Sequence, residues 1–156
     1  MPRVRNGFTL LEVMVVVVIL GVLAAVVAAN FLGTVDESKQ SAFVSSIRTI
    51  RDSAVLFVNQ TGTYPEDASS GTIPAGLDEY IRTEDWEGGT PIGGVWDFEL
   101  NEHSLTSAFG VHFDGTGDTR DDAYMVQIDS IFDDGDLAAG VFRKIADDRY
   151  YYVLAE

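Results

Sequence analysis

A long apolar stretch dominates the first part of the chain. No residue from Val13 to Ala29 is charged or strongly polar, and Glu12 is the only charged residue within 8–32. These 25 residues would form about 37 Å of helix, which is enough to cross a hydrocarbon core of about 30 Å. The pattern therefore predicts a membrane-spanning helix over residues 8–32.

A second, amphipathic segment follows without a strong break. Gly33 lowers helix propensity but does not end a helix. Beyond it, apolar residues recur at separations of four, three, four and three, on one helical face: Phe43, Ile47, Ile50, Ala54 and Phe57. Gly62 and Pro65 then end the helix near Gln60. We expect a single helix over residues 8–60, whose amphipathic half, 33–60, packs on a folded body as part of its core.

The remaining residues, 61–156, have the pattern of a small α+β body. Two runs alternate between apolar and polar residues, as in strands with one buried face: Trp96, Phe98 and Leu100, then Phe109, Val111 and Phe113. A helical spacing follows, capped by Asp121 or Asp122: Tyr124, Met125, Ile128, Ile131 and Phe132. A helical turn at 77–81 and a last hairpin, 141–145 with 150–154, complete a small antiparallel sheet laid against the amphipathic half of the helix.

Charge and composition exclude several functions. The net charge is −15 with only ten Lys and Arg, so the chain lacks the basic surface that nucleic acid requires. There is no cysteine, which excludes disulfides, thiolate metal sites and cysteine nucleophiles. No Gly-x-Ser-x-Gly, phosphate loop or dinucleotide fingerprint is present, and we expect no enzyme. The excess carboxylates either keep the body soluble or bind cations.

The flanks of the apolar segment predict its orientation. Arg3 and Arg5 precede it, and Asp36 and Glu37 follow it, which places the N-terminus in the cytoplasm and the body outside. A secretory signal has a shorter apolar core than this segment, an uncleaved anchor would have the same hydropathy, and neither explains an acidic residue at Glu12. A carboxylate there needs a partner. An amine on a neighbouring chain would be one, and cleavage after Gly7 would create it on Phe8.

The string Gly7-Phe8-Thr9-Leu10-Leu11-Glu12-Val13 resembles the cleavage and methylation motif of type IV prepilins. The string from Gly62 to Pro65 is similar to the end of the long helix in pilins and in type II secretion pseudopilins. The resemblance implies that residues 1–7 are a leader, that a prepilin peptidase cuts between Gly7 and Phe8, and that the Phe8 amine is methylated. It also implies that Glu12 pairs with this amine on an adjacent subunit.

The same resemblance implies a fold, a location and partners. The fold would be pilin-like, with the hydrophobic half of the helix protruding from the body. The protein would be a single-pass protein of the bacterial inner membrane with a periplasmic body, and would then enter a filament. Its partners would be identical subunits in a homopolymer, other pilins and the inner-membrane assembly platform.

One loop carries candidate ligands for a cation. Asp133, Asp134 and Asp136 surround Gly135, and hard oxygen ligands at this spacing suit Ca²⁺, although the spacing is not that of an EF-hand. Major pseudopilins hold calcium in their C-terminal loops, which supports the same assignment by resemblance. A plain helix-terminating turn is the alternative. The loop from Asp114 to Asp118 matches an EF-hand only at its first positions.

Two histidines complete the candidate ligands. His103 and His112 have no second ligand close by in the sequence, and we interpret both as surface residues. Calcium is therefore the only cofactor that the sequence suggests.

Several functions remain open from the sequence. The leading hypothesis is a structural subunit of a type II secretion pseudopilus or a related type IV pilus-like filament. A major pilin of a type IV pilus, serving adhesion or motility, is the nearest alternative. A monomeric, membrane-tethered module that binds a cation or ligand is the alternative of another class, and an anchored hydrolase is the weakest.

Overall fold

A computed structural model describes residues 8–156, with side chains described for all of these except 28–33. The predicted leader, residues 1–7, lies outside this range. The first element is the helix α1, Leu10–Thr61, which matches the single helix predicted over 8–60. By internal contacts the chain divides into two units, residues 1–38 and 39–156, and α1 contributes to both.

Over Leu10–Val27 in the first unit, α1 carries apolar side chains on every side, and Glu12 is the one charged residue. Among the described residues, one segment is long and apolar enough to cross a membrane: Leu10–Val27, with a mean hydropathy of 3.0 and no part of it buried. Large side chains such as Val16, Val18 and Leu23 are each more than half exposed. Nothing in the described chain covers this surface.

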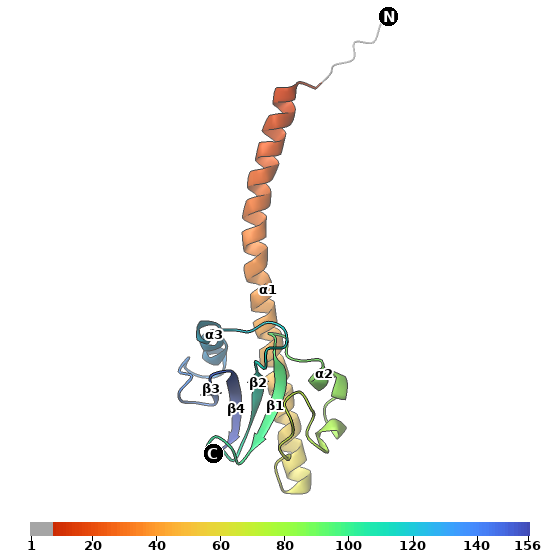
Figure 1. Cartoon of the computed structure of the whole chain (residues 1–156), viewed down its shortest axis with the longest axis vertical. Helices are drawn as coiled ribbons and strands as arrows, with labels where there is room; N and C mark the ends of the chain where they lie inside the picture. Colours follow the sequence, from red (N-terminus) through yellow and green to blue (C-terminus); the bar gives the residue numbers. More distant parts are fainter. Residues whose placement is uncertain (1–7) are drawn as a thin grey trace, which may run out of the picture. The chain divides into compact units, whose positions relative to one another are not determined.

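The second unit is built around a four-stranded antiparallel sheet in the order β1-β2-β4-β3 (Figure 1). The strands are β1 (Val95–Leu100), β2 (Ser107–His112), β3 (Phe142–Ala146) and β4 (Arg149–Ala155). The central pairings place Trp96 opposite Val111 and Phe109 opposite Tyr152. The predicted α+β layout, with a last hairpin formed by β3 and β4, is confirmed.

Three further helical elements accompany the sheet, two between α1 and β1 and one between β2 and β3. The turn predicted near 77–81 is the 3₁₀ helix η1, Leu77–Glu79. The helix α2, Thr83–Glu87, lies against β1 and was not predicted, because Trp86 is the one buried residue in an otherwise polar segment. The helix α3, Asp122–Phe132, lies against β3, and Asp121 is its cap, accepting a hydrogen bond from the Tyr124 amide at 2.9 Å.

The amphipathic face of α1 forms the core of the second unit, as predicted. Phe43, Ile47 and Ala54 are completely buried. The Phe43 ring stacks on Trp96 of β1 with centroids 5.3 Å apart and meets Phe142 of β3 edge-on at 6.3 Å. Offset and edge-on contacts of this kind add to the stability that burial alone provides.

Two predicted patterns were wrong in part. Ile131 was placed on the buried face of α3 but is 47% exposed, and Asp129 is completely buried. The strand β1 was expected to have one buried face, but Asp97 and Glu99 on its other face are only 2% and 6% exposed. Arg149 and Tyr151 of β4 cover these carboxylates, so this part of the face away from α1 is a packed polar layer.

The aromatic contact between α1 and β1 gives a test of the core. Replacing Phe43 by Ala should lower the free energy of unfolding by about 3–5 kcal/mol, because it leaves a cavity against Trp96. Chemical unfolding of the detergent-solubilised chain, followed by the fluorescence of the buried Trp86 and Trp96, measures it. Leu56→Ala, on the exposed side of the same helix, should change stability by about 0.5 kcal/mol or less. Equal losses in the two variants would contradict this packing.

Candidate functional site

The N-terminal end of α1 is closed by a reciprocal pair of hydrogen bonds. The Glu12 amide donates to Thr9 Oγ1 at 3.2 Å, and the Thr9 amide donates to Glu12 Oε2 at 2.8 Å. The Thr9 hydroxyl also donates to Glu12 Oε2, at 2.9 Å. This is a capping box, in which each side chain satisfies a backbone amide of the first turn. Glu12, which is predicted to act in assembly, therefore also starts the helix, a role that was not predicted.

The predicted processing and assembly residues lie at this same end. Phe8 immediately precedes the capping box, and its side chain is 85% exposed. Gly7, the other residue of the predicted cleavage site, lies outside the described residues. The Glu12 carboxylate is thus held next to the position at which cleavage would leave a free amine. Whether Phe8 and Glu12 perform their predicted roles stays a prediction.

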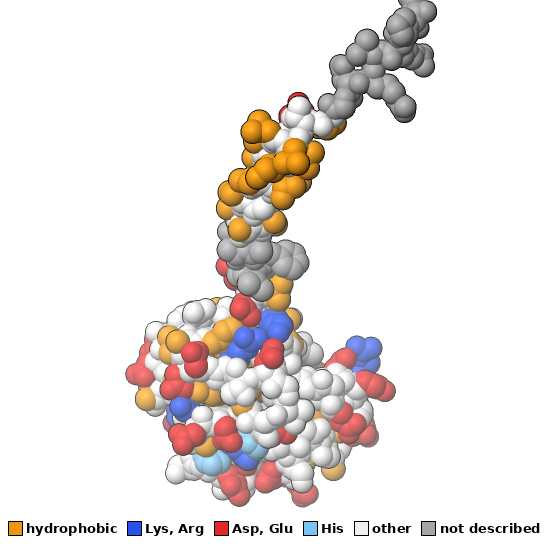
Figure 2. All heavy atoms as spheres, turned by 45° about the horizontal axis from the view of Figure 1, so that its top comes forward, with side chains coloured by type: hydrophobic (Ala, Val, Ile, Leu, Met, Phe, Trp, Pro, Cys, Tyr) orange, Lys and Arg blue, Asp and Glu red, His pale blue; other side chains and the backbone are white. Residues whose placement is uncertain are grey.

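The apolar surface of α1 begins directly after the capping box. Figure 2 shows hydrophobic side chains along the described part of this segment, whereas acidic side chains are spread over the second unit. In water, an uncovered surface of this size would be strongly unfavourable. The first unit is therefore built to be covered by lipid or by other chains.

The predicted aspartate site is partly brought together by the fold. Carboxylate oxygens of Asp133 and Asp134 lie within 4.8 Å of each other and of an oxygen of Asp129. Asp136 is not part of this group, and its Oδ1 accepts a hydrogen bond from the Ala138 amide at 3.0 Å. Asp129 was missed, although its position four residues before Asp133 places the two on one face of α3.

Asp129 is the unusual member of this group. It is completely buried, and neither of its carboxylate oxygens has a hydrogen-bond partner. Burial, followed by the neighbouring Asp133 and Asp134, raises the pKa of Asp129 to about 7. An unpaired buried carboxylate costs several kcal/mol of stability unless a proton or a cation neutralises it.

The loop after α3 is shaped around Asp133. Its Oδ1 accepts from the Asp134 amide at 2.8 Å and its Oδ2 from the Val141 amide at 2.5 Å. A Cβ at Gly140, whose φ is 76°, would lie 2.0 Å from Asp133 Oδ2. Glycine at this position therefore permits the loop to close over the carboxylate.

The alternative loop from Asp114 to Asp118 is a turn held by its own side chains. Asp114 accepts hydrogen bonds from the Thr116 amide at 2.9 Å and from its hydroxyl at 3.1 Å. Asp118 pairs with Lys39 at 3.3 Å and with Arg120 at 3.5 Å. Because Asp118 already pairs with two positively charged side chains, this loop is disfavoured as a cation site.

The polar layer on the sheet forms a second group of acids. Arg149 Nη1 donates to Asp97 at 3.0 Å and also to Glu99, while the Tyr151 hydroxyl donates to Asp97. Burial, together with the charges of Asp97 and Asp67, raises the pKa of Glu99 to about 7. The positive charge of one guanidinium is therefore too small to balance the negative charges of the carboxylates in this layer.

Both histidines lie on the face of the sheet that carries this polar layer. His112 Nδ1 lies 2.9 Å from the Ser70 hydroxyl, and its Nε2 lies 3.2 Å from Asp148. With 16% of its side chain exposed, His112 is not the surface residue that the sequence suggested. His103 is exposed, as expected, but Glu99 and Glu102 lie beside it.

Comparison with known proteins identifies the family. The family model for the prokaryotic N-terminal methylation motif matches residues 2–28. The type II secretion system core protein G of Klebsiella michiganensis is 30% identical over 133 residues, which cover 76% of this chain and 90% of the relative. The chain belongs to the type II secretion system core protein G family.

Other members of the protein G family are similar over different lengths. The protein of Klebsiella pneumoniae is 30% identical over 130 residues, covering 76% of this chain and 91% of the relative. The protein of Aeromonas hydrophila is 38% identical over 80 residues, and this match spans 51% of this chain and about half of the relative, 52%. The prepilin motif and the pseudopilin family inferred from the sequence are thus confirmed.

The buried carboxyl of Asp129 makes stability depend on pH. Its pKa is about 7 in the folded chain against an ordinary value of 3.8, so the folded state holds this proton more tightly than the unfolded state. Between these values, raising the pH therefore favours unfolding. In the presence of a chelator, Asp129→Asn should gain stability relative to wild type as pH rises, by at most about 1.4 kcal/mol per pH unit.

Denaturant unfolding at several pH values measures this difference. The exposed Asp136→Asn, in the same loop, should run parallel to wild type. A parallel profile for Asp129→Asn as well would show that the carboxyl is not destabilised by its environment.

Proposed function

We propose that this chain is a structural subunit of the type II secretion pseudopilus, made as a prepilin that is cleaved after Gly7 and methylated on Phe8. The observation that carries the proposal is the junction between the capping box and the uncovered apolar helix. A carboxylate stands at the start of a segment, Leu10–Val27, that no described part of the chain covers. The match to the methylation motif over residues 2–28 and membership of the protein G family support it.

The apolar segment would serve two environments in turn. In the inner membrane, lipid covers it, since its length and hydropathy suit a single span. Arg3 and Arg5 before it favour a cytoplasmic N-terminus and a periplasmic body. In the filament, the same surface would contact the apolar segments of neighbouring subunits, so that extraction from lipid does not expose it to water.

Glu12 would supply the specificity that apolar contacts lack. An acidic residue at the centre of a membrane-spanning helix costs about 2.5–3.5 kcal/mol, and the cost is smaller near the edge of the span, where Glu12 lies. The hydrogen bonds from Thr9 reduce this cost within one chain but leave the negative charge in place. A cleaved neighbour carries a positive amine on Phe8, and pairing with it would neutralise the charge and fix the register between subunits.

This role is structural rather than catalytic. The proposed partners are the prepilin peptidase, identical subunits, other pilins and an inner-membrane assembly platform. A type IV pilus built for adhesion or motility would use the same N-terminal chemistry. The relatives are type II secretion system proteins, which favours the secretion pseudopilus over a type IV pilus.

Intact mass of the protein extracted from its native membranes tests the processing step. Wild type should lack Met1–Gly7 and carry one additional methyl group. Glu12→Ala should be cleaved in the same way but should yield no filaments in sheared surface fractions, because the charge that pairs with the Phe8 amine is gone. Glu37→Ala, a matched acidic residue of α1 beyond the apolar segment, should be cleaved and assembled.

A full-length mass for wild type would exclude prepilin processing and favour a membrane-tethered, monomeric module. Normal filaments from Glu12→Ala would exclude the proposed charge pairing while leaving processing intact.

We also propose that Asp129, Asp133 and Asp134 hold a calcium ion at the C-terminal end of α3. The observation that favours this is the orphaned, fully buried carboxylate of Asp129 next to two exposed ones. Three carboxylates provide only hard oxygen ligands, which Ca²⁺ prefers. Bound calcium would neutralise Asp129 and join α3 to the loop that precedes β3.

Thermal unfolding in calcium and in chelator tests this second proposal. Calcium at about 100 times its dissociation constant should stabilise wild type by about 2.7 kcal/mol. Asp129→Asn and Asp134→Asn should lose most of this gain, whereas Asp114→Asn, in the loop held by its own side chains, should keep it. A calcium effect that persists in both site variants would place the ion elsewhere.

A further inference from the structure

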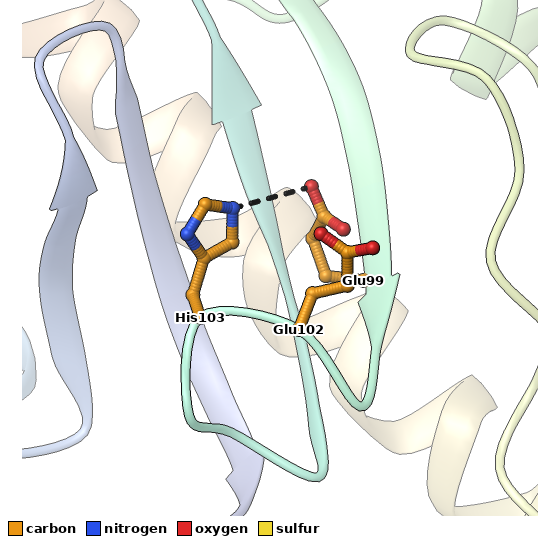
Figure 3. A group of neighbouring side chains, drawn as sticks. All are labelled: Glu99, Glu102 and His103. Carbon is orange, nitrogen blue, oxygen red and sulfur yellow. Dashed lines mark ion pairs between the residues drawn. The ribbon is translucent and has the colours of Figure 1, made fainter.

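The turn between β1 and β2 carries potential ligands of a different kind. Among the described residues, three non-glycine residues have positive φ, and all lie in this turn: Asn101, His103 and Ser104, at 57°, 51° and 64°. This backbone returns the chain toward the end of β1. As Figure 3 shows, Glu102 and His103 rise from the turn on the side where Glu99 lies.

The three side chains are close enough to share one ion. A carboxylate oxygen from each of Glu99 and Glu102 and a ring nitrogen of His103 all lie within 4.8 Å of one another. His103 Nε2 is 3.9 Å from Glu99 Oε1. Ligands of a zinc-like ion bind at about 2.0–2.2 Å, so two of them lie about 3–3.5 Å apart. Glu102 and His103 are exposed and need to move by only about 1 Å to reach that geometry.

The surroundings favour a positive charge. Beside Glu99 is a polar cavity of about 240 Å³, whose lining includes four carboxylates and one guanidinium: Asp67, Asp97, Glu99, Glu102 and Arg149. Arg149 Nη1 binds Asp97 and Glu99 Oε1, the oxygen from which the distance to His103 is measured, so a metal would take Oε2 of Glu99. One guanidinium against four carboxylates leaves an excess of three negative charges in this lining. The cavity has room for an ion with several waters, since each water takes about 30 Å³.

We propose that Glu99, Glu102 and His103 form a binding site for a divalent transition metal of the zinc class at the β1–β2 turn. One imidazole and two carboxylates make a mixed nitrogen and oxygen set, which suits Zn²⁺ and its neighbours rather than Ca²⁺. Water would complete the coordination from the cavity. The metal would tie the turn, with its three left-handed residues, to the buried end of β1.

This site differs from the aspartate group in ligand chemistry and location. Asp129, Asp133 and Asp134 offer only oxygen and lie at the end of α3, whereas the turn offers a ring nitrogen. The two sites are therefore expected to select different ions from the same solution. The metal site at the turn does not depend on filament assembly.

Titration with Co²⁺, a spectroscopic substitute for zinc, tests the site in the full chain in detergent. We expect saturable binding of one equivalent with visible absorption, displaced by Zn²⁺ but not by excess Ca²⁺. Glu102→Gln and His103→Gln should each weaken binding at least tenfold. Both residues are exposed, so the Trp fluorescence of the folded body should be unchanged.

Matched controls separate this site from others. His112→Gln changes the other histidine of the sheet and should keep wild-type affinity, as should Asp133→Asn in the aspartate group. Absence of saturable Co²⁺ binding would overturn the proposal. So would an affinity that is unchanged in His103→Gln, reduced equally in His112→Gln, or lost when Ca²⁺ is added.

Discussion

The structure depends on one constraint: no described part of the chain covers the apolar segment Leu10–Val27 of α1. Leu10–Val27 is apolar on every side and entirely exposed. Such a surface is stable only in lipid or against other apolar helices. The chain begins this segment with a capping box, in which Thr9 binds the carboxylate of Glu12. Insertion into a membrane or the proposed assembly would cover this surface, and the proposed cleavage would create an amine that neutralises this charge on a neighbouring chain.

The second half of α1, in contrast, is partly covered by the chain itself. From Phe43 onward, one face of α1 is buried by the sheet, with Phe43 between Trp96 and Phe142. The body folds without a disulfide, because the chain has no cysteine. It carries its excess of acids partly on the surface and partly in two groups, around Asp129 and Glu99, where positive charge is insufficient. Bound cations would balance the negative charge of both groups.

Patterns that repeat along the chain could be predicted from sequence, and contacts between distant residues could not. Helical spacing identified α1 and α3, and alternation identified β1 and β2, because both periods are local. The same rules misplaced Ile131 and missed the burial of Asp129, since the buried face of α3 runs through Met125, Ile128 and Asp129, and hydropathy assigns an aspartate to the surface. Alternation predicts that Asp97 and Glu99 face solvent, but Arg149, about fifty residues away, covers them. The capping box of Thr9 and Glu12, by contrast, has a local signal in its Thr-x-x-Glu spacing.

The most direct test concerns what covers the apolar helix in the assembled state. A photo-reactive phenylalanine analogue at Val16, which is exposed near the middle of the apolar segment, reports its neighbours in cells that contain the secretion apparatus. The account predicts a ladder of cross-linked products between copies of this chain, which Glu12→Ala abolishes. Cross-links to lipid alone, with only monomeric protein in both cases, would contradict the account.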